Sequence, residues 1–217
     1  MSLVPPHHLR PYMTENTDWQ IIFDGSRHLI QTPHWSFKVD FDEFNFISIK
    51  QNPFFRFFKV CKKKHLICDV TAGLGRDSYL LSQLGYSLIS IERHPVLMTL
   101  FAEARARCDN NLFPDWHLLF GNCEDFLQSN IAPDTIYFDP MFENRKKAMT
   151  QKYTQVIRHY CQDSSDNATY EFLYAYCKDN KKRLIIKQPT TGASKTFSKP
   201  HQIITLSRMS NLWLYQF

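Results

Sequence analysis

The stretch LICDVTAGLGRD, residues 66–77, decides the fold of this chain. The apolar run over 66–70 predicts a buried strand, and the apolar spacing over 76–84 predicts a helix. Gly85 stands where a left-handed residue would end that helix, and 87–92 is a second apolar run. Strand, glycine turn, helix and strand in this order are the repeating unit of a parallel sheet.

The same alternation continues toward the carboxyl end of the chain. Helices are expected over 95–108, 151–160 and 170–178, and strands over 117–120, 135–139 and 183–187. The last two apolar segments, 202–207 and 212–217, flank 208–211 and are typical of a hairpin. We therefore expect an α/β fold with a mostly parallel sheet, helices on both faces and a C-terminal antiparallel hairpin.

The residues before this alternation have a different pattern. Short strand-like runs at 19–23, 28–32 and 35–41 surround the turn residues 24–26 and predict a small β-meander. Asn52-Pro53 then indicates the start of a helix through Val60. The expected division is a small N-terminal β-rich subdomain over 1–48 and a main domain over 49–217.

Composition excludes several classes of protein. The 217 residues are 43% hydrophobic and 22% charged, which is typical of a globular chain. No apolar run approaches the roughly 18 residues that cross a bilayer, and the first ten residues lack the apolar stretch of a signal peptide. The six cysteines include no Cys-x-x-Cys pair, so we expect free thiols, no metal site and a soluble, cytoplasmic protein. The oligomeric state is not indicated.

Positive charge is concentrated in the last third of the chain. Residues 139–217 carry thirteen Lys or Arg and six Asp or Glu, whereas 1–138 carry thirteen and fifteen. Such a surface can bind phosphates by releasing counterions. The alternative is a solvated face that keeps the protein soluble. The candidate RNA-binding residues are Arg145, Lys146, Lys147 and Lys187.

Ligands of a parallel sheet bind beyond the carboxyl ends of its strands, so residues that follow strands are the candidates. The glycine turn after the first strand supplies Asp69, Thr71, Ala72, Gly73 and Gly75 as candidate cofactor contacts. Glu92 ends the second strand, where a carboxylate can accept hydrogen bonds from both hydroxyls of an adenosine ribose. The alternative is that the glycines only form a tight turn and Glu92 is a surface carboxylate.

Two cofactors can be held in this way, NAD and S-adenosylmethionine. Ser78 stands where a dinucleotide motif has its third glycine, and the acidic residues Asp69, Glu124 and Asp125 suit a ligand that carries positive charge. The sequence therefore favours S-adenosylmethionine, a sulfonium. Glu124 or Asp125 could contact the adenine amino group, although either could instead begin a short helix through Leu127.

The fourth strand of the predicted sheet ends in Asp139-Pro140-Met141-Phe142. The Asp139 carboxylate and the Pro140 carbonyl can accept hydrogen bonds from an exocyclic amine and aim its lone pair at a methyl group. Phe142 can stack on a base that has left its helix. A carboxylate pairs best with the adjacent N1–H and N2 amino donors of guanine. The alternative is an ordinary Asp-Pro turn, with Phe142 in the core.

Four segments, taken together, resemble the ribosomal RNA small subunit methyltransferase J family. They are 69–77, Glu92-Arg93-His94-Pro95, 139–142 with the basic tripeptide 145–147, and Leu184 to Pro189; the resemblance covers roughly 47–217. It implies a class I, Rossmann-like methyltransferase that modifies guanine N2 in small-subunit rRNA. It also implies cofactor contacts at Gly73, Arg76, Asp77, Glu92 and Arg93, with Asp139 in the active site beside the cofactor.

The leading hypothesis is thus an S-adenosylmethionine-dependent guanine-N2 methyltransferase whose partner is ribosomal RNA or the small ribosomal subunit. The transfer should need no metal. Two alternatives stay open: an amino-group methyltransferase acting on a DNA base or a protein amide, and a basic RNA-binding module whose cofactor pocket is vestigial.

Overall fold

The computed structural model describes residues 4, 6–13, 18–41, 54–56, 65–108, 115–129, 132–140, 152–161, 166–191 and 196–217. Of the helix expected from Asn52 to Val60, it describes Phe54 to Arg56 as a single 3₁₀ turn; the rest lies outside the described residues. Within these ranges no helix has both the length and the apolar character that a membrane span requires. The five cysteines found there are free thiols.

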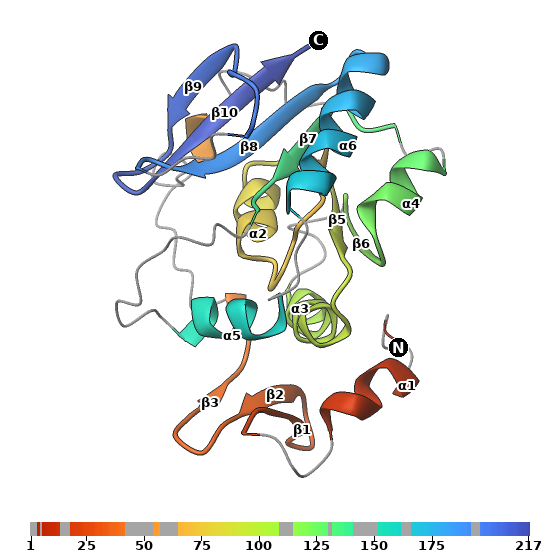
Figure 1. Cartoon of the computed structure of the whole chain (residues 1–217). Helices are drawn as coiled ribbons and strands as arrows, with labels where there is room; N and C mark the ends of the chain where they lie inside the picture. The colour runs from red at the N-terminus through yellow and green to blue at the C-terminus, as the bar shows by residue number, and fades with distance from the viewer. Residues whose placement is uncertain are drawn as a thin grey trace.

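A seven-stranded sheet forms the centre of the main domain (Figure 1). The strands run in the order β6-β5-β4-β7-β8-β10-β9, and β10 is antiparallel to both of its neighbours while the first five are parallel. The expected mostly parallel sheet with a C-terminal antiparallel hairpin is confirmed. The strands are β4 (Leu66–Asp69), β5 (Ser87–Glu92), β6 (Trp116–Phe120), β7 (Thr135–Phe138), β8 (Arg183–Pro189), β9 (Gln202–Thr205) and β10 (Ser210–Gln216).

Strand order reverses at β4, whose neighbours are β5 on one side and β7 on the other. The chain leaves β4 toward β5 and β6 and then returns to the other side of β4 with β7. Loops after β4 and β7 therefore diverge at this point and leave a crevice at the carboxyl edge of the sheet. The sheet topology thus places the candidate residues of the first and fourth predicted strands side by side.

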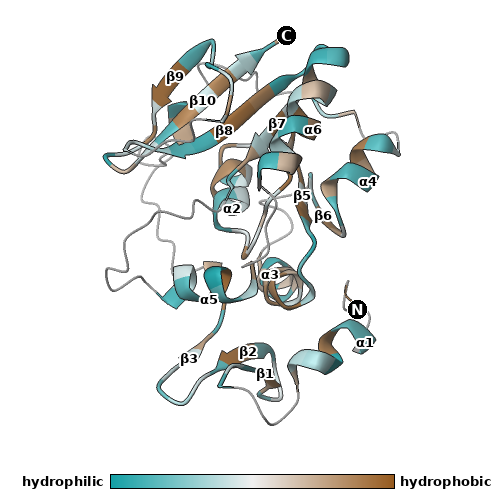
Figure 2. Cartoon of the chain, viewed as in Figure 1, coloured by the Kyte–Doolittle hydropathy of each residue, from teal (hydrophilic) through white to brown (hydrophobic). Residues whose placement is uncertain are grey.

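Helices cover both faces of the sheet, because neighbouring residues of each strand face opposite sides. In β7, Tyr137 joins the buried cluster with the side chains of α2 and α3, while Ile136 and Phe138 join a second cluster with α6. Figure 2 shows brown, hydrophobic stretches in β5 and β8 and teal, hydrophilic stretches in α4 and α6. The helices are α2 (Arg76–Gln83), α3 (Pro95–Arg107), α4 (Cys123–Gln128), α5 (Lys152–Tyr160) and α6 (Asp166–Asp179).

Several element boundaries differ from expectation by a few residues. Helix α6 begins at Asp166, within the polar segment before the expected start at 170, because its buried stripe of Tyr170, Leu173 and Cys177 does not require the first turn to be apolar. Strand β10 begins at Ser210 rather than at Leu212, since Ser210 pairs with Pro189 of β8. Strand β9 correspondingly ends at Thr205 rather than at Ser207, so the four-residue turn lies two residues earlier than expected.

The N-terminal residues form α1 (Pro6–Leu9), η1 (Arg10–Tyr12) and an antiparallel sheet of β1 (Gln20–Phe23), β2 (His28–Gln31) and β3 (Ser36–Phe37). The predicted β-meander is confirmed. It contacts α3 and α5 of the main domain: Glu103 of α3 accepts the His28 backbone N–H at 2.7 Å and faces the His28 ring at 2.6 Å, and Trp19 stacks on His159 of α5 with ring centroids 4.2 Å apart. Figure 1 shows this small sheet below α3 and α5. The division into 1–48 and 49–217 stays a prediction.

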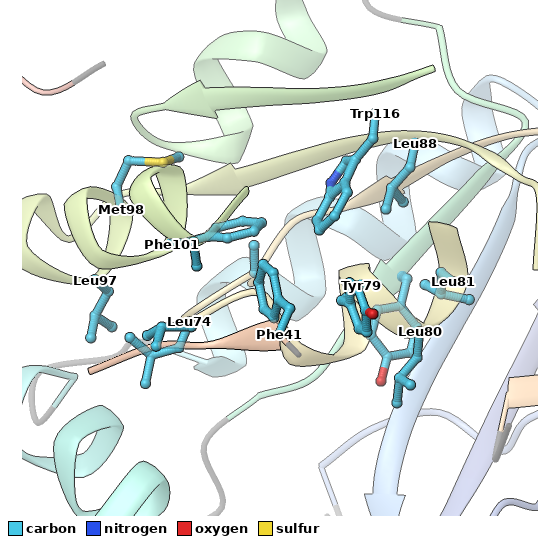
Figure 3. Packing of buried hydrophobic residues seen from close by; sticks show 14 of the residues in the cluster. Phe41, Leu74, Tyr79, Leu80, Leu81, Leu88, Leu97, Met98, Phe101 and Trp116 are labelled. Carbon is cyan, nitrogen blue, oxygen red and sulfur yellow. The ribbon is translucent and has the colours of Figure 1, made fainter. Parts of the chain in front are cut away.

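An aromatic cluster joins the end of the N-terminal segment to the main domain (Figure 3). Phe41 stacks on Tyr79 of α2 with ring centroids 4.8 Å apart and meets the edge of Phe101 of α3 at 6.1 Å. Trp116 of β6 lies 5.6 Å from Phe101. Residues far apart in the sequence therefore share one core beside the turn that follows β4.

Candidate functional site

A cavity of about 430 Å³ lies at the carboxyl edge of the sheet, where the strand order reverses. Its walls come from the turn after β4, the ends of β5 and β7, helix α5 and the turn between β9 and β10. A volume of this size suits a nucleoside-sized ligand. Nine of the candidate cofactor residues line it: Thr71, Ala72, Gly73, Arg76, Asp77, Glu92, Arg93, Glu124 and Asp139.

The turn after β4 is held by backbone hydrogen bonds on both sides. The Ala72 N–H donates to Ile91 of β5 at 3.0 Å, and the Gly75 N–H donates to Ala72 at 2.8 Å. Gly75 has φ +79° and begins α2, and a Cβ there would lie 2.1 Å from Phe101. Gly75 is not among the residues that line the cavity. The structure therefore shows that Gly75 packs against α3, and its cofactor contact stays a prediction.

Glu92 is buried at the end of β5, and its two oxygens accept the N–H groups of Gly73 and His94, each at 2.7 Å. Burial raises the pKa of this carboxyl, and the backbone hydrogen bonds partly offset the rise. Each carboxylate oxygen can accept more than one hydrogen bond, so Glu92 keeps acceptor capacity toward the cavity that it lines. The same side chain thus shapes the turn and faces the cavity.

Asp69 has a different role from the one expected. Its side chain is 1% exposed and does not line the cavity. Its carboxylate accepts the Ser78 hydroxyl at 2.5 Å and the Thr71 N–H at 3.2 Å. Ser90 donates its hydroxyl to Ser78 at 2.8 Å and accepts the Trp116 indole N–H at 2.9 Å. Asp69 therefore anchors the turn from inside the protein through a chain of hydrogen bonds that reaches β6.

Both acidic residues after β6 lie in helix α4, but only one of them lines the cavity. Glu124 lines the cavity and accepts the Thr169 hydroxyl at 3.3 Å. Asp125 is exposed, receives a hydrogen bond from Asn122 at 3.4 Å and is not among the cavity residues. Of the two expected adenine contacts, Glu124 is therefore the candidate. The short helix expected here is confirmed as α4.

A partly buried lysine, Lys187 of β8, joins two carboxylates that line the cavity. Lys187 Nζ lies 2.9 Å from Asp139 Oδ2 and 2.5 Å from Asp77 Oδ2, and the Tyr137 hydroxyl donates to the same Asp77 oxygen at 2.7 Å. Burial lowers the pKa of Lys187, but the carboxylates of Asp139 and Asp77 outweigh burial, so the net shift is upward. Lys187 is therefore a fixed positive charge that orients Asp139.

This placement corrects the prediction for Lys187. We expected an RNA phosphate contact on the basic surface, but the side chain is 19% exposed and both of its carboxylate partners line the cavity. Reaching a phosphate would break two ion pairs that its own burial requires. Of the other predicted substrate residues, Pro140 lines the cavity, and Phe142, Arg145, Lys146 and Lys147 lie outside the described residues.

Helix α5 supplies cavity residues that the sequence did not indicate. Tyr153, Ile157 and Arg158 line the cavity, and Ile157 would lie 3.5 Å from a Cβ at Gly73 in the turn after β4. Burial raises the pKa of the Tyr153 phenol, so it stays protonated at neutral pH. The sequence pattern predicts a helix over 151–160, but it does not indicate which part of the protein that helix packs against. Within the described ranges, no group of three metal-binding side chains occurs.

The buried Asp69 gives a prediction about stability and pH. Burial raises the pKa of Asp69 to about 7, Ser78 opposes this, and the nearby Asp77 carboxylate adds to it. A carboxyl whose pKa is higher in the folded than in the unfolded chain costs stability as pH rises from about 4 to about 7. The free energy of unfolding of the wild type should therefore fall between these pH values. In Asp69→Asn this fall should be smaller by about 2–4 kcal/mol. Urea unfolding at pH 4.5 to 7.5 measures it.

Asp125→Asn is the matched control for that measurement, because it removes an exposed carboxylate near the same edge of the sheet. Its free energy of unfolding should follow the pH dependence of the wild type. Parallel curves for Asp69→Asn and the wild type would contradict the prediction.

Comparison with known proteins gives matches of two kinds. The family model described as "Putative SAM-dependent methyltransferase" matches residues 42–211. Ribosomal RNA small subunit methyltransferase J of Bdellovibrio bacteriovorus is 35% identical over 133 residues, covering 60% of this chain and 52% of that protein. The protein of the same name in Thioalkalivibrio sulfidiphilus is 34% identical over 168 residues, covering 72% and 65%. The chain thus spans between half and two thirds of the length of these relatives.

A solved structure supports the fold. The crystal structure of a SAM-dependent methyltransferase from Neisseria gonorrhoeae has a TM-score of 0.67 and 19% identity, covering 97% of this chain and 90% of its own. At this identity the likeness concerns the fold, and it extends over the N-terminal segment as well as the main sheet.

Proposed function

Since the chain belongs to the SAM-dependent methyltransferase family whose model it matches over residues 42–211, we propose that it methylates the exocyclic N2 of a guanine in small-subunit rRNA. One observation carries the proposal: the Asp139 carboxylate lies in the same cavity as the turn after β4 and Glu92. The two relatives described above, both named ribosomal RNA small subunit methyltransferase J, support the choice of RNA. The proposal implies a cytoplasmic protein that meets rRNA or the small ribosomal subunit.

The cavity residues fit S-adenosylmethionine. Glu92 offers acceptor oxygens suited to two ribose hydroxyls, and Glu124 offers an acceptor for an adenine amino group. Asp77 and Asp139 line the same cavity, where Lys187 pairs with both of them, so these three side chains together carry one net negative charge. When bound, the cofactor supplies a methyl group on a positively charged sulfur.

The protein's own contribution to the reaction is positioning. The amine on C2 of guanine is a weak nucleophile because its lone pair is delocalised into the ring. Asp139 and the Pro140 carbonyl would accept hydrogen bonds from that amine and turn its lone pair toward the methyl group. Lys187 holds one oxygen of Asp139, which fixes the direction of the carboxylate. Asp139 is also placed to accept the proton that the amine loses.

Guanine is favoured over adenine by the shape of the acceptor. A carboxylate has two acceptor oxygens, and guanine presents two adjacent donors, N1–H and the N2 amino group. Adenine presents a donor beside an acceptor, and the latter would face a carboxylate oxygen unfavourably. Asp139 therefore selects for guanine by the same contact that orients the amine.

Mass-spectrometric nucleoside analysis of small-subunit rRNA from cells with and without the protein tests the proposal. The expected result is N2-methylguanosine at one position that disappears without the protein and returns when the purified protein and S-adenosylmethionine are added to that rRNA. Methyl transfer to DNA or peptide but not to RNA would select another amino-group substrate. RNA binding without cofactor binding by calorimetry would select a binding module.

A further inference from the structure

The turn between β9 and β10 presents an exposed apolar side chain next to the cavity. Leu206, Ser207 and Ser210 line the cavity, and Met209 between them is 77% exposed. A single exposed methionine on a protein surface needs no explanation. This one has three further features that together point to a function.

The first feature is that the turn is rigid. The N–H groups of Leu206 and Ser207 donate to the Ser210 carbonyl at 3.0 and 2.9 Å. Met209 donates its own N–H to the Ser207 hydroxyl at 3.1 Å and accepts a hydrogen bond from the Thr190 N–H at 3.1 Å. Both backbone groups of Met209 are therefore used within the protein, which fixes the point at which its exposed side chain leaves the surface.

The second feature is a neighbouring exposed aromatic residue. Phe54 lines the cavity and packs against Tyr137 with ring centroids 5.7 Å apart, while the next residue, Phe55, is 38% exposed. The Arg56 guanidinium donates to the carbonyl of Thr205, the last residue of β9. A hydrogen bond therefore links segment 54–56 to the end of β9, next to the turn that carries Met209. Each of the two segments exposes an apolar side chain.

The third feature is charge. Arg56 and Arg208 are exposed beside these apolar groups. The described segment 196–217, which contains the hairpin, has two basic residues, Lys199 and Arg208, and no Asp or Glu. An apolar protein surface would explain the apolar groups but not the positive charge. An anionic membrane would explain both, but not their place at the rim of the cavity that holds Asp139. A polyanion with flat apolar faces, which is a nucleic acid, fits both.

We propose that Met209 inserts into the RNA stack at the place that the target guanine leaves. A stacked base cannot bring its amine to a cavity at the edge of the sheet, so it must be extruded, and extrusion costs stacking free energy. An apolar side chain that enters the vacated step recovers part of that cost. Arg208, the adjacent exposed residue, contacts the flanking phosphate. This inference rests on the proposed RNA substrate.

The test compares two RNA substrates and two variants. The substrates are a folded small-subunit rRNA transcript and a short single-stranded RNA with the same target sequence. Met209→Ala should slow single-turnover methylation of the transcript about tenfold and leave the short RNA within twofold, because a base without a helical stack needs no replacement. Met209→Leu should restore the rate on the transcript. S-adenosylmethionine binding should not change.

Ile203→Ala is the matched control, since Ile203 is 55% exposed on β9 of the same hairpin and does not line the cavity. It should leave both rates unchanged. The proposed insertion is wrong if Met209→Ala and Ile203→Ala methylate the transcript at the same rate. It is also wrong if Met209→Ala slows methylation of both RNAs equally. In either case the methyltransferase proposal stands. If the wild type methylates neither RNA, the proposed function itself is wrong and the insertion falls with it.

Discussion

Asp139→Ala is expected to lower methyl transfer to small-subunit rRNA by at least about a hundredfold while leaving the affinity for S-adenosylmethionine within about tenfold, or 1.4 kcal/mol. The variant loses the group that would orient the amine and accept its proton. It should still fold, because Lys187 keeps its ion pair with Asp77 when Asp139 is removed. Single-turnover transfer of labelled methyl groups and calorimetric titration of the cofactor measure the two quantities.

Two further variants make the interpretation of Asp139→Ala specific. Asp139→Asn keeps one acceptor oxygen but cannot take up a proton, so its rate should lie between those of Asp139→Ala and the wild type. Asp125→Ala removes an exposed carboxylate from the same edge of the sheet but outside the cavity, and should be active. A wild-type rate for Asp139→Ala would show that Asp139 does not orient the amine.

Gly75→Ala should lower the free energy of unfolding by about 2–4 kcal/mol. The new Cβ would lie 2.1 Å from Phe101, which is fully buried in α3, so that ring has to move within a packed core. The φ of +79° adds about 1 kcal/mol of backbone strain for any residue with a side chain. Urea unfolding at a fixed pH measures the loss.

Gly85→Ala separates the two contributions. Gly85 has φ +80° but nothing within 4 Å of its would-be Cβ, so its variant should lose only the backbone part, about 1 kcal/mol. Phe101→Leu placed in the Gly75→Ala background should cost less than Phe101→Leu alone, since the smaller side chain relieves the clash. Equal losses for the two glycine variants would contradict the packing role assigned to Gly75.

Sequence periodicity predicted the sheet and the position of the site because both depend on local patterns. The strands β4, β5 and β7 are short apolar runs, and residues after parallel strands meet at one edge. Glu92 and Asp139 were found in this way and both line the cavity. What such a pattern gives is a position along the chain.

The direction of a side chain at that position depends on packing. Asp69 ends β4 as Glu92 ends β5, yet it points inward because Ser78 and Thr71 offer it buried donors. Lys187 shares a sheet face with Ile185, whose partner on β7 is Tyr137, so strand alternation could have placed it beside the α2 side chains. Helix α5 gave no such signal, because its packing against the turn after β4 is set by tertiary structure.

The position of β10 in the sheet has a consequence for the timing of assembly. β10 follows β9 in the chain but lies between β8 and β9 in the sheet. In the described sheet β9 pairs only with β10, so β9 cannot join the sheet until β10 has been translated. The 206–210 side of the cavity therefore cannot form while those residues are still inside the ribosomal exit tunnel.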